Sequence, residues 1–185
     1  MPKIEKITKQ TENPYVNLYL VEGKNKVDHL FRYYVASRAK TMEALKIKTK
    51  KNTPDGVLMY SLYGDKRDKI VLVRQYRVSI DDYIYEFPAG LVESGEEFHE
   101  AAVREMHEET GLTFHPLKVD PCYEKPFFTT IGMTDEACSA VYGWCEGEIS
   151  RKYLEESEVI EVVLADREEA KRILRDCLLY TSDAA

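Results

Sequence analysis

Short runs of alternating apolar and polar residues recur along the chain, separated by polar turn residues. A period of two residues is typical of strands that bury one face. Two stretches instead have the spacing of an amphipathic helix. The predicted strands cover residues 15–22, 30–37, 57–63, 70–76, 83–87, 137–146 and 159–164. The predicted helices run from Glu96 or Glu97 to Thr110 and over residues 167–176.

The order of these elements predicts the fold class. Asn25 and its charged neighbours form a turn between the first two strands, and Pro88 closes the strand that precedes the first helix. Strands outnumber helices, and the first helix follows a strand directly. We therefore expect an α/β protein, an α/β/α sandwich with a mixed sheet, preceded by an added N-terminal antiparallel sheet.

The helix that ends at Thr110 has recognisable boundaries. Ser94 or Gly95 is the expected N-cap, and Gly111 supplies the left-handed residue that stops the helix. At 100° per residue, one flank of this helix is apolar and packs on the core. The residues of that flank are Ala102, Val103 and Met106.

The neighbouring flank carries Glu105, Glu108 and Glu109. Like charges at these spacings repel one another unless a cation lies among them. Carboxylates suit Mg²⁺, with Mn²⁺ as a substitute, and Mg²⁺ is commonly shared with substrate phosphates. Arg104 lies beside this flank and can fix a carboxylate by charge-assisted hydrogen bonds. The alternative is an exposed charged helix, on which His99 and His107 also face solvent.

Composition narrows the class of protein. The chain has 185 residues, 32% of them charged, and a net charge of -7, which argues against a nucleic-acid partner. No apolar run approaches the roughly 20 residues of a membrane-spanning helix, and the first residues lack the apolar core of a signal peptide. Four cysteines without a paired spacing fit reduced thiols. We therefore expect a cytoplasmic protein without a membrane partner.

The last nine residues do not resemble a natural chain end. Residues 177–185, CLLYTSDAA, resemble a translated adapter used in sequencing libraries. The sequence thus predicts three parts: an N-terminal strand extension over residues 1–50, a catalytic domain over residues 51–176, and a non-native tail over residues 177–185.

The segment from Gly90 to Leu112 resembles the Nudix box at every fixed position. That box is Gly, five residues, Glu, seven residues, Arg-Glu, an aliphatic residue, any residue, Glu-Glu, any residue, Gly and an aliphatic residue. The matching residues are Gly90, Glu96, Arg104, Glu105, Met106, Glu108, Glu109, Gly111 and Leu112. The resemblance implies a loop–helix–loop in which Glu105 and Glu109 are the chief metal ligands. Glu108 would assist them, and Ala89 would add a backbone carbonyl.

A wider region, about residues 30 to 165, is similar to the ADP-ribose pyrophosphatase branch of that family. The segments VRQYR at residues 73–77 and YEFPAGLVESGE at residues 85–96 carry this similarity. It implies a homodimer that exchanges its N-terminal sheet and shares its active site. It also implies four substrate-binding residues, each of which could instead be structural. These are Arg77, Arg38, an adenine-stacking Tyr33, and Glu86, a further carboxylate near the metal.

The resemblance further implies a general base outside the box, in the loop before the last core strand. Glu158 aligns best with that role, and Glu155, Glu156 and Glu136 are the alternatives. Arg104 and Glu108 complete the expected catalytic set. The competing interpretation of residues 155–158 is an acidic surface loop.

We therefore expect a Mg²⁺-dependent hydrolase. It would cleave the diphosphate of ADP-ribose or a related nucleoside diphosphate sugar into a nucleoside monophosphate and a sugar phosphate. Ile131 departs from the branch, because many ADP-ribose hydrolases have a proline in the corresponding Ser-Pro-Gly-like run. Two alternatives stay open: a nucleoside triphosphate housecleaning pyrophosphatase, and an inactive Nudix module that senses a nucleotide.

Overall fold

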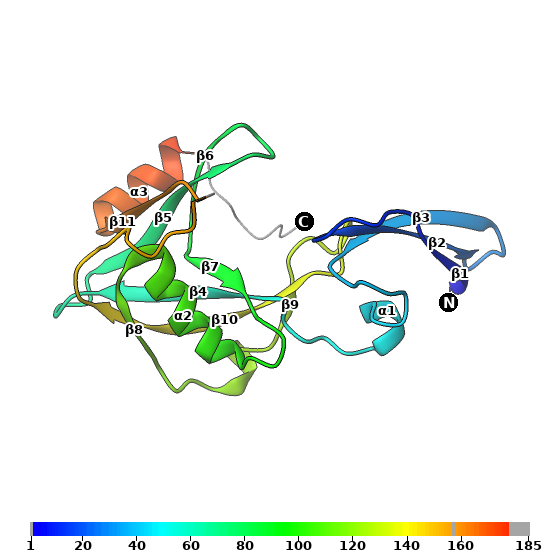
Figure 1. Ribbon diagram of the computed structural model, residues 1–185, viewed down its shortest axis with the longest axis horizontal. Helices are drawn as coiled ribbons and strands as arrows, with labels where there is room; N and C mark the ends of the chain where they lie inside the picture. Colours follow the sequence, from blue (N-terminus) through cyan, green and yellow to red (C-terminus); the bar gives the residue numbers. More distant parts are fainter. Residues whose placement is uncertain (1, 157, 178–185) are drawn as a thin grey trace. The chain divides into compact units, whose positions relative to one another are not determined.

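The chain forms two compact units, which we describe separately (Figure 1). The computed structural model describes residues 2–156 and 158–177. The smaller unit comprises Met1–Thr53 together with Phe127–Ala137, and the larger comprises Pro54–Pro126 together with Cys138–Ala185. The smaller unit therefore contains a segment that lies far from the rest of it in the sequence.

Three antiparallel strands form the sheet of the smaller unit, in the order β1-β2-β3. They are β1 (Lys3–Lys9), β2 (Asn17–Lys24) and β3 (Leu30–Ser37). The short helix α1 (Lys46–Thr49) follows them, and β9 (Phe127–Phe128) begins the inserted segment. That segment is tied to β3, because the Ala36 N–H donates to the Met133 carbonyl at 2.9 Å. The expected N-terminal antiparallel sheet is present.

The strand β1 was not expected, and the expected strand over residues 15–22 lies two residues further along, as β2. The sequence of β1, KIEKITK, contains four charged residues and has no fully buried position. A charged edge strand lacks the hydrophobic signal that reveals a buried strand, although its charges protect the sheet edge. The N-terminal sheet therefore has three strands, where the sequence indicated a two-stranded hairpin.

A mixed sheet forms the centre of the larger unit. Its order is β11-β5-β4-β10-β8, with β6 paired to β5 and β7 to β4. The pair β4–β10 is parallel, and the other pairs along this path are antiparallel. The strands are β4 (Gly56–Tyr63), β5 (Lys69–Arg77), β6 (Asp82–Glu86), β7 (Ala89–Leu91), β8 (Thr113–Pro116), β10 (Ala137–Glu146) and β11 (Ile160–Ala165).

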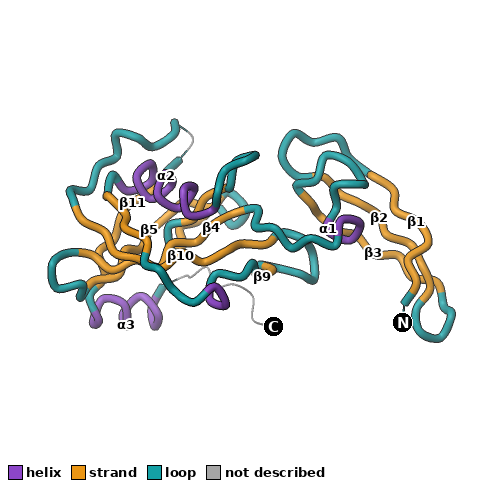
Figure 2. Tube along the Cα trace, turned by 90° about the horizontal axis from the view of Figure 1, so that it is seen from below, coloured by secondary structure: helices purple, strands orange, loops and turns teal. Residues whose placement is uncertain are grey.

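Two helices enclose this sheet, α2 (Phe98–Thr110) on one face and α3 (Arg167–Asp176) on the other, as Figure 2 shows. A short 3₁₀ turn, η1 (Pro121–Tyr123), lies between β8 and β9. This is the α/β/α arrangement that the sequence predicted, and the fold class is confirmed. The strands β7 and β8 were not expected, because runs of three and four residues are too short to show a period.

The core between α2 and the sheet holds the helix at a fixed rotation. Ala101, Ala102 and Met106 are fully buried there, beside Val57, Met59, Val71 and Val141 of the sheet. Val103, which we expected on this flank, is 39% exposed, and Ala101 takes its place. The helix is therefore rotated so that Glu109, three residues after Met106, is buried as well.

The N-cap of α2 is Glu97, where Ser94 or Gly95 was expected. Its carboxylate accepts a hydrogen bond from the His99 N–H at 2.8 Å. The preceding residues close a turn of their own, in which the Glu93 N–H donates to the Glu96 carboxylate at 2.9 Å. In the described part of the chain, no helix has the length and apolar character required to cross a membrane.

Candidate active site

A close contact between β7 and α2 positions the acidic flank of the helix. The Met59 N–H donates to the Pro88 carbonyl at 2.9 Å, and Gly90 pairs with Val57, so the chain after β6 lies against β4. A Cβ at Gly90 would lie 1.9 Å from the Glu105 Cδ. Glycine is therefore required at this position for the Glu105 side chain to lie between the helix and β7.

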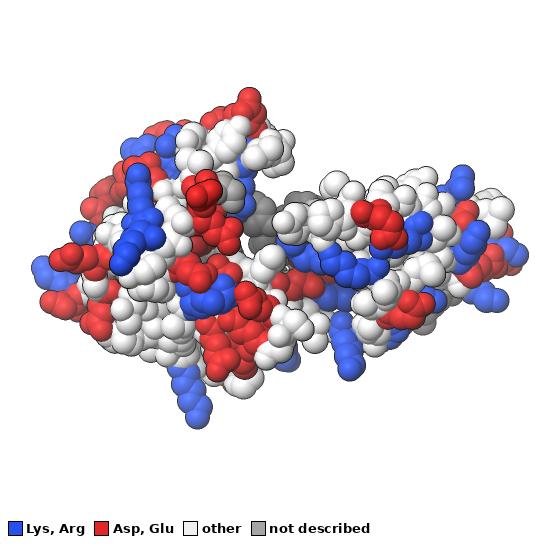
Figure 3. All heavy atoms as spheres, viewed as in Figure 1, with Lys and Arg blue, Asp and Glu red and all other residues white. Residues whose placement is uncertain are grey.

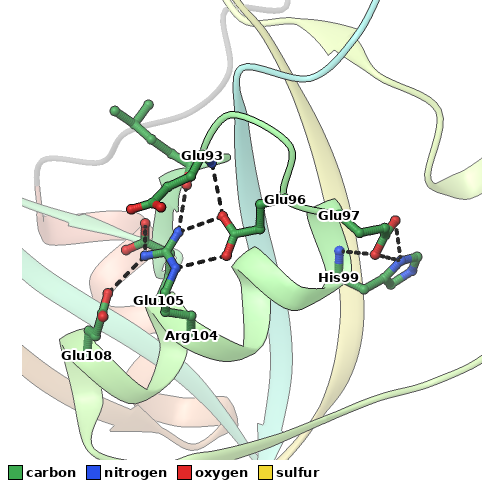
Figure 4. Close-up of polar contacts among 8 residues, drawn as sticks. Glu93, Glu96, Glu97, His99, Arg104, Glu105 and Glu108 are labelled. Atoms are coloured by element: carbon green, nitrogen blue, oxygen red, sulfur yellow. Dashed lines mark hydrogen bonds and ion pairs between the residues drawn. The ribbon is translucent and has the colours of Figure 1, made fainter.

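Arg104 joins three carboxylates of the helix region, as Figure 4 shows. Its Nε and Nη2 donate to the two oxygens of Glu96, both at 3.0 Å, and its Nη1 donates to Glu105 and Glu108, both at 2.9 Å. A further bond joins Nη2 to the Leu91 carbonyl at 3.0 Å. These bonds raise the pKa of Arg104 and lower that of the Glu96 carboxyl. Arg104 thus holds two of the predicted ligands at fixed positions.

Glu109 lies deepest in the acidic flank, with 4% of its surface exposed. One oxygen accepts a hydrogen bond from the Ala89 N–H at 3.3 Å. Burial raises the pKa of the Glu109 carboxyl well above its ordinary value, and the nearby charges of Glu105, Glu158 and Glu86 raise it further. Burial likewise raises the pKa of Glu105, against the lowering effect of Arg104. A buried carboxylate surrounded by carboxylates favours either a proton or a bound cation.

Glu158 lies in the loop between β10 and β11, and its negative charge is close enough to Glu109 to raise the pKa of that carboxyl. The loop begins where the Ser150 N–H donates to the Thr110 carbonyl at the end of α2, at 2.9 Å. It ends where the Tyr76 N–H donates to the Val159 carbonyl at 3.1 Å. The structure therefore brings the predicted base beside the predicted metal ligands.

Arg77 and Glu86 face each other on the paired strands β5 and β6. The Arg77 Nε donates to Glu86 Oε1 at 2.9 Å, and its Nη2 donates to Oε2 at 2.7 Å. The Glu86 side chain is only 4% exposed, whereas that of Arg77 is 41% exposed. Two donors of Arg77 are thus used to neutralise a buried carboxylate, and Arg77 itself lines the cavity described next.

A cavity of about 580 Å³ unites these groups within the larger unit. Its wall includes most of the predicted residues there: Arg77, Ala89, Arg104, Glu105, Glu108, Glu109 and Glu158. Figure 3 shows the acidic side chains gathered on the face of this unit that carries α2. The volume lies within the range of roughly 300–1,000 Å³ that small-molecule sites occupy.

Three polar residues of the cavity wall were not predicted from the sequence: Gln75, Glu93 and Tyr153. Gln75 could have been found, because it precedes Arg77 by two residues on the same strand and so shares its face. Tyr153 lies in a loop without periodicity, and no local signal marks it. Glu155, an alternative base, also lines the cavity.

Tyr33 and Arg38 belong to the smaller unit. The Tyr33 hydroxyl donates to the Gly132 carbonyl, and the Arg38 Nε donates to Glu136 at 2.8 Å. Tyr33 is 45% exposed, so it is not the core aromatic that the alternative interpretation required. Ile131 is 62% exposed in the same unit, where it lines an apolar pocket with Tyr19, Leu45 and Phe128.

The carboxylates fit a hard divalent cation in their chemistry. Glu109 is buried among like charges, and the missing Cβ of Gly90 leaves room for Glu105 beside it. Among residues 2–156 and 158–177, however, no group of three His, Cys, Asp or Glu side chains converges on one point. The physical reason is that Arg104 already holds Glu105 and Glu108. Binding of an ion would require these two carboxylates to share their oxygens between Arg104 and the metal.

Comparison with known proteins agrees with this geometry. The profile of the NUDIX domain matches residues 52–178. An ADP-ribose pyrophosphatase of Bacillus subtilis is 33% identical over 121 residues, which are 63% of this chain and 62% of the relative. An ADP-sugar pyrophosphatase of Mus musculus is 38% identical over 87 residues, which are 45% of this chain and 40% of the relative. The chain thus spans less than two thirds of these curated relatives.

A solved structure shares the fold. The crystal structure of an ADP compounds hydrolase superposes with a TM-score of 0.68 and 19% identity, covering 95% of this chain and 83% of that one. The match extends over nearly all of the chain and so includes both a Nudix-type sheet and the N-terminal strands. The predicted resemblance to ADP-ribose pyrophosphatases is confirmed by these relatives.

Proposed function

The chain belongs to the Nudix family, and we propose that it hydrolyses the diphosphate of ADP-ribose or a related nucleoside diphosphate sugar. The products are a nucleoside monophosphate and a sugar phosphate. The observation that carries this proposal is the buried Glu109, which lines a cavity of about 580 Å³ with Glu105 and Glu158 and also has the charge of Glu86 nearby. Such a cluster is unfavourable unless a proton or a cation joins it, and a diphosphate is the natural further ligand of a bound cation.

We propose Mg²⁺ as the cation, with Mn²⁺ as a substitute, and the set Glu105, Glu108, Glu109 and the Ala89 carbonyl as its ligands. The divalent ion that Nudix hydrolases need would neutralise the diphosphate charge and make a water molecule more acidic. Oxygen ligands alone favour Mg²⁺ or Mn²⁺ over softer metals. Arg104 supports the set, because its guanidinium fixes Glu105 and Glu108 from the side.

The other predicted site residues are proposed to act as the general base and as substrate contacts. Glu158 is the proposed general base: it takes a proton from water as the water oxygen attacks one phosphorus and the bridging P–O bond breaks. Arg77 offers its remaining amino group to substrate oxygens, and Glu86 holds the guanidinium in place by two hydrogen bonds. Tyr33 and Arg38 are proposed as substrate contacts from the N-terminal unit, in a homodimer that exchanges its N-terminal sheet.

The names of the relatives support a diphosphate sugar as the substrate. Two of them are an ADP-ribose and an ADP-sugar pyrophosphatase. Ile131, in place of the branch's usual proline, favours testing other nucleoside diphosphate sugars beside ADP-ribose. A cytoplasmic location stays a prediction of the sequence.

A substrate panel tests the proposal. The purified chain is incubated with Mg²⁺ and separately with ADP-ribose, other ADP- and UDP-sugars and nucleoside triphosphates, and the products are identified by mass. We expect AMP and ribose 5-phosphate from ADP-ribose, and no hydrolysis of the nucleoside triphosphates. Hydrolysis of triphosphates alone would favour the housecleaning alternative. Binding without turnover of any substrate would favour the sensing module.

A further inference from the structure

For the described residues of the loop between β10 and β11, the hydrogen bonds to the rest of the larger unit lie near the two ends of the loop. Backbone hydrogen bonds join Ser150 to Thr110 and Val159 to Tyr76. The carboxylate of Glu158 is hydrogen-bonded to the backbone of the same loop, since Glu158 Oε2 accepts the Glu155 N–H at 3.1 Å. The Glu158 N–H in turn donates to the Glu155 carbonyl at 3.0 Å. The position of this carboxylate therefore follows the position of the loop.

Between these ends, the described residues include an aromatic contact that links the loop to the helix that carries the acidic flank. The rings of Tyr153 and His107 lie 4.4 Å apart between centroids, at an angle of 39°. His107 directly precedes Glu108 in α2, on the side of the helix that faces away from the core. Lys152 places its ammonium 5.5 Å from the centre of the Tyr153 ring. The contact thus joins the segment that bears Glu158 to the segment that bears the proposed metal ligands.

Both rings are at the surface, so their contact adds little to the core. Tyr153 is 45% exposed, and His107 is also exposed. Tyr153 nevertheless lines the cavity together with Glu155 and Glu158. A surface contact of this kind has a small effect on global unfolding, yet it can restrict a loop whose described hydrogen bonds to the rest of the unit lie near its ends.

We propose that His107 and Tyr153 form a positioning pair, which docks the loop on α2 and sets Glu158 against Glu109. This inference rests on the proposed function, in which Glu158 accepts the proton of the attacking water. A displacement of a catalytic group by about 1 Å lowers the rate by roughly a hundredfold. Loss of either ring should therefore reduce turnover, although neither ring takes part in the chemical step.

The first test separates positioning from substrate contact. We expect Tyr153→Ala and His107→Ala each to lower kcat by roughly tenfold to a hundredfold, with KM and the Mg²⁺ concentration for half-activation nearly unchanged. Tyr153→Phe and His107→Phe keep a ring at each position and should restore most of kcat. The double alanine variant should be no worse than either single variant, because both remove one contact. Tyr123→Ala, which removes another exposed tyrosine of the same unit, is the matched control.

The second test needs no substrate. Arg151 and Lys152 are exposed trypsin sites beside Tyr153. If the ring contact holds the loop, His107→Ala should speed cleavage at both sites severalfold without altering the cleaved sequence, and His107→Phe should not. This measurement is made on the folded full-length chain, with mass spectrometry to locate the cuts.

The outcomes are distinct. A raised KM with unchanged kcat in Tyr153→Ala would overturn the inference, because it would make Tyr153 a substrate contact. Equal rates of trypsin cleavage in wild type and His107→Ala would also overturn it. Absence of any hydrolysis by the wild-type chain would instead reject the proposed function, and the trypsin experiment would still report whether the ring contact restrains the loop.

Discussion

At the scale of single residues, the site consists of charges that are only partly balanced. The positive charge of Arg104 is hydrogen-bonded to the carboxylates of Glu96, Glu105 and Glu108. The charged groups that act on Glu109 are instead other carboxylates. The fold therefore maintains a deep negative position at some cost to its own stability. This arrangement allows substitutions to separate the effect on stability from the effect on activity.

The substitutions Glu105→Gln and Glu109→Gln should each remove most turnover while the fold stays intact. Substitution of groups that merely support a ligand commonly costs 10- to 100-fold, and loss of a proposed ligand should cost at least roughly as much. Without metal, each variant should unfold at a slightly higher temperature, because relief of like-charge repulsion contributes about 0.2–0.5 kcal/mol. Steady-state rates at saturating Mg²⁺ and melting curves in chelator measure both effects.

The control for these variants is Glu100→Gln, which changes an exposed glutamate in the first turn of the same helix. It should leave the rate unchanged. Wild-type rates in Glu105→Gln or Glu109→Gln at saturating Mg²⁺ would remove these residues from the ligand set.

Arg77→Lys should affect both substrate affinity and stability. A lysine has one ammonium and cannot reproduce the two parallel hydrogen bonds from Arg77 to the buried Glu86. Loss of a charge-assisted contact costs about 1.5–3 kcal/mol, so we expect KM for ADP-ribose to rise roughly tenfold to a hundredfold. The melting temperature should fall as well, since Glu86 stays buried with a weaker partner.

Arg74→Lys provides the comparison, because Arg74 is a half-exposed strand arginine whose partner Glu161 is 3.5 Å away on the surface. Its KM and melting temperature should stay close to wild type. An unchanged KM in Arg77→Lys would mean that Arg77 serves only to neutralise Glu86.

At the scale of elements, the sequence predicted the helices and strands that have a sustained hydrophobic period or a dense motif. The strand over residues 30–37 and the helix over residues 167–176 have the expected bounds, and α2 ends at the expected Thr110. The strand β1 was not predicted, because its charged side chains obscure the alternation of apolar and polar residues. The strands β7 and β8 were not predicted because they are too short to show that alternation. The N-cap of α2 was misplaced because Ser94 and Gly95 belong to a separate turn, which the Glu93 N–H closes on Glu96, whereas the Glu97 carboxylate caps the helix at the His99 N–H.

The same limit applies to the candidate site. The fixed spacing of the box identified Glu105, Glu108 and Glu109, because one helical turn places them on one flank. The pairing of Arg77 with Glu86 and the tilted ring contact of Tyr153 with His107 join residues of separate elements. Such contacts depend on how strands and loops meet in space, which period and composition do not specify.

The N-terminal end of α2 contains a pH-sensitive contact. Burial lowers the pKa of His99, but its hydrogen bonds to Glu124 at 2.8 Å and to Glu97 at 3.1 Å outweigh this effect, so the pKa is raised overall. A histidine whose pKa is higher in the folded state stabilises the fold fully below its unfolded pKa of about 6.5. This stabilisation is lost as the pH rises through the folded-state pKa.

We therefore expect His99→Gln to lower the melting temperature more at about pH 5.5 than at about pH 8.5. The effect should be at most about 1 kcal/mol, because the His99 side chain is 35% exposed and solvent screens the pair. His29→Gln, in an exposed turn of the smaller unit, serves as the control and should show no such difference. A loss of stability in His99→Gln that is equal at both pH values would show that the charge of His99 does not contribute.

At the scale of the whole molecule, the chain combines a Nudix-type unit with a smaller strand-rich unit. The smaller unit is completed by residues 127–137, which hydrogen-bond to β3 and pair Glu136 with Arg38. Several of its large apolar side chains are strongly exposed. They include Tyr15, Leu30, Tyr34, Ile131 and Met133. A small three-stranded unit with this much exposed apolar surface is a candidate for burial against another chain.

We expect the full chain to be a homodimer, with a mass in solution of twice 21.4 kDa by light scattering. Deletion of residues 1–40 removes β1, β2 and β3 and leaves residues 127–137 without their hydrogen-bonding strand, so the product should be inactive and either monomeric or aggregated. Because such a deletion can also fail for lack of folding, the point variant Leu30→Glu supplies a second measurement. Leu30 is 78% exposed, so a charge there costs the isolated unit little and should weaken only an interface that buries it. A full chain that scatters as a monomer and is fully active would contradict the dimer.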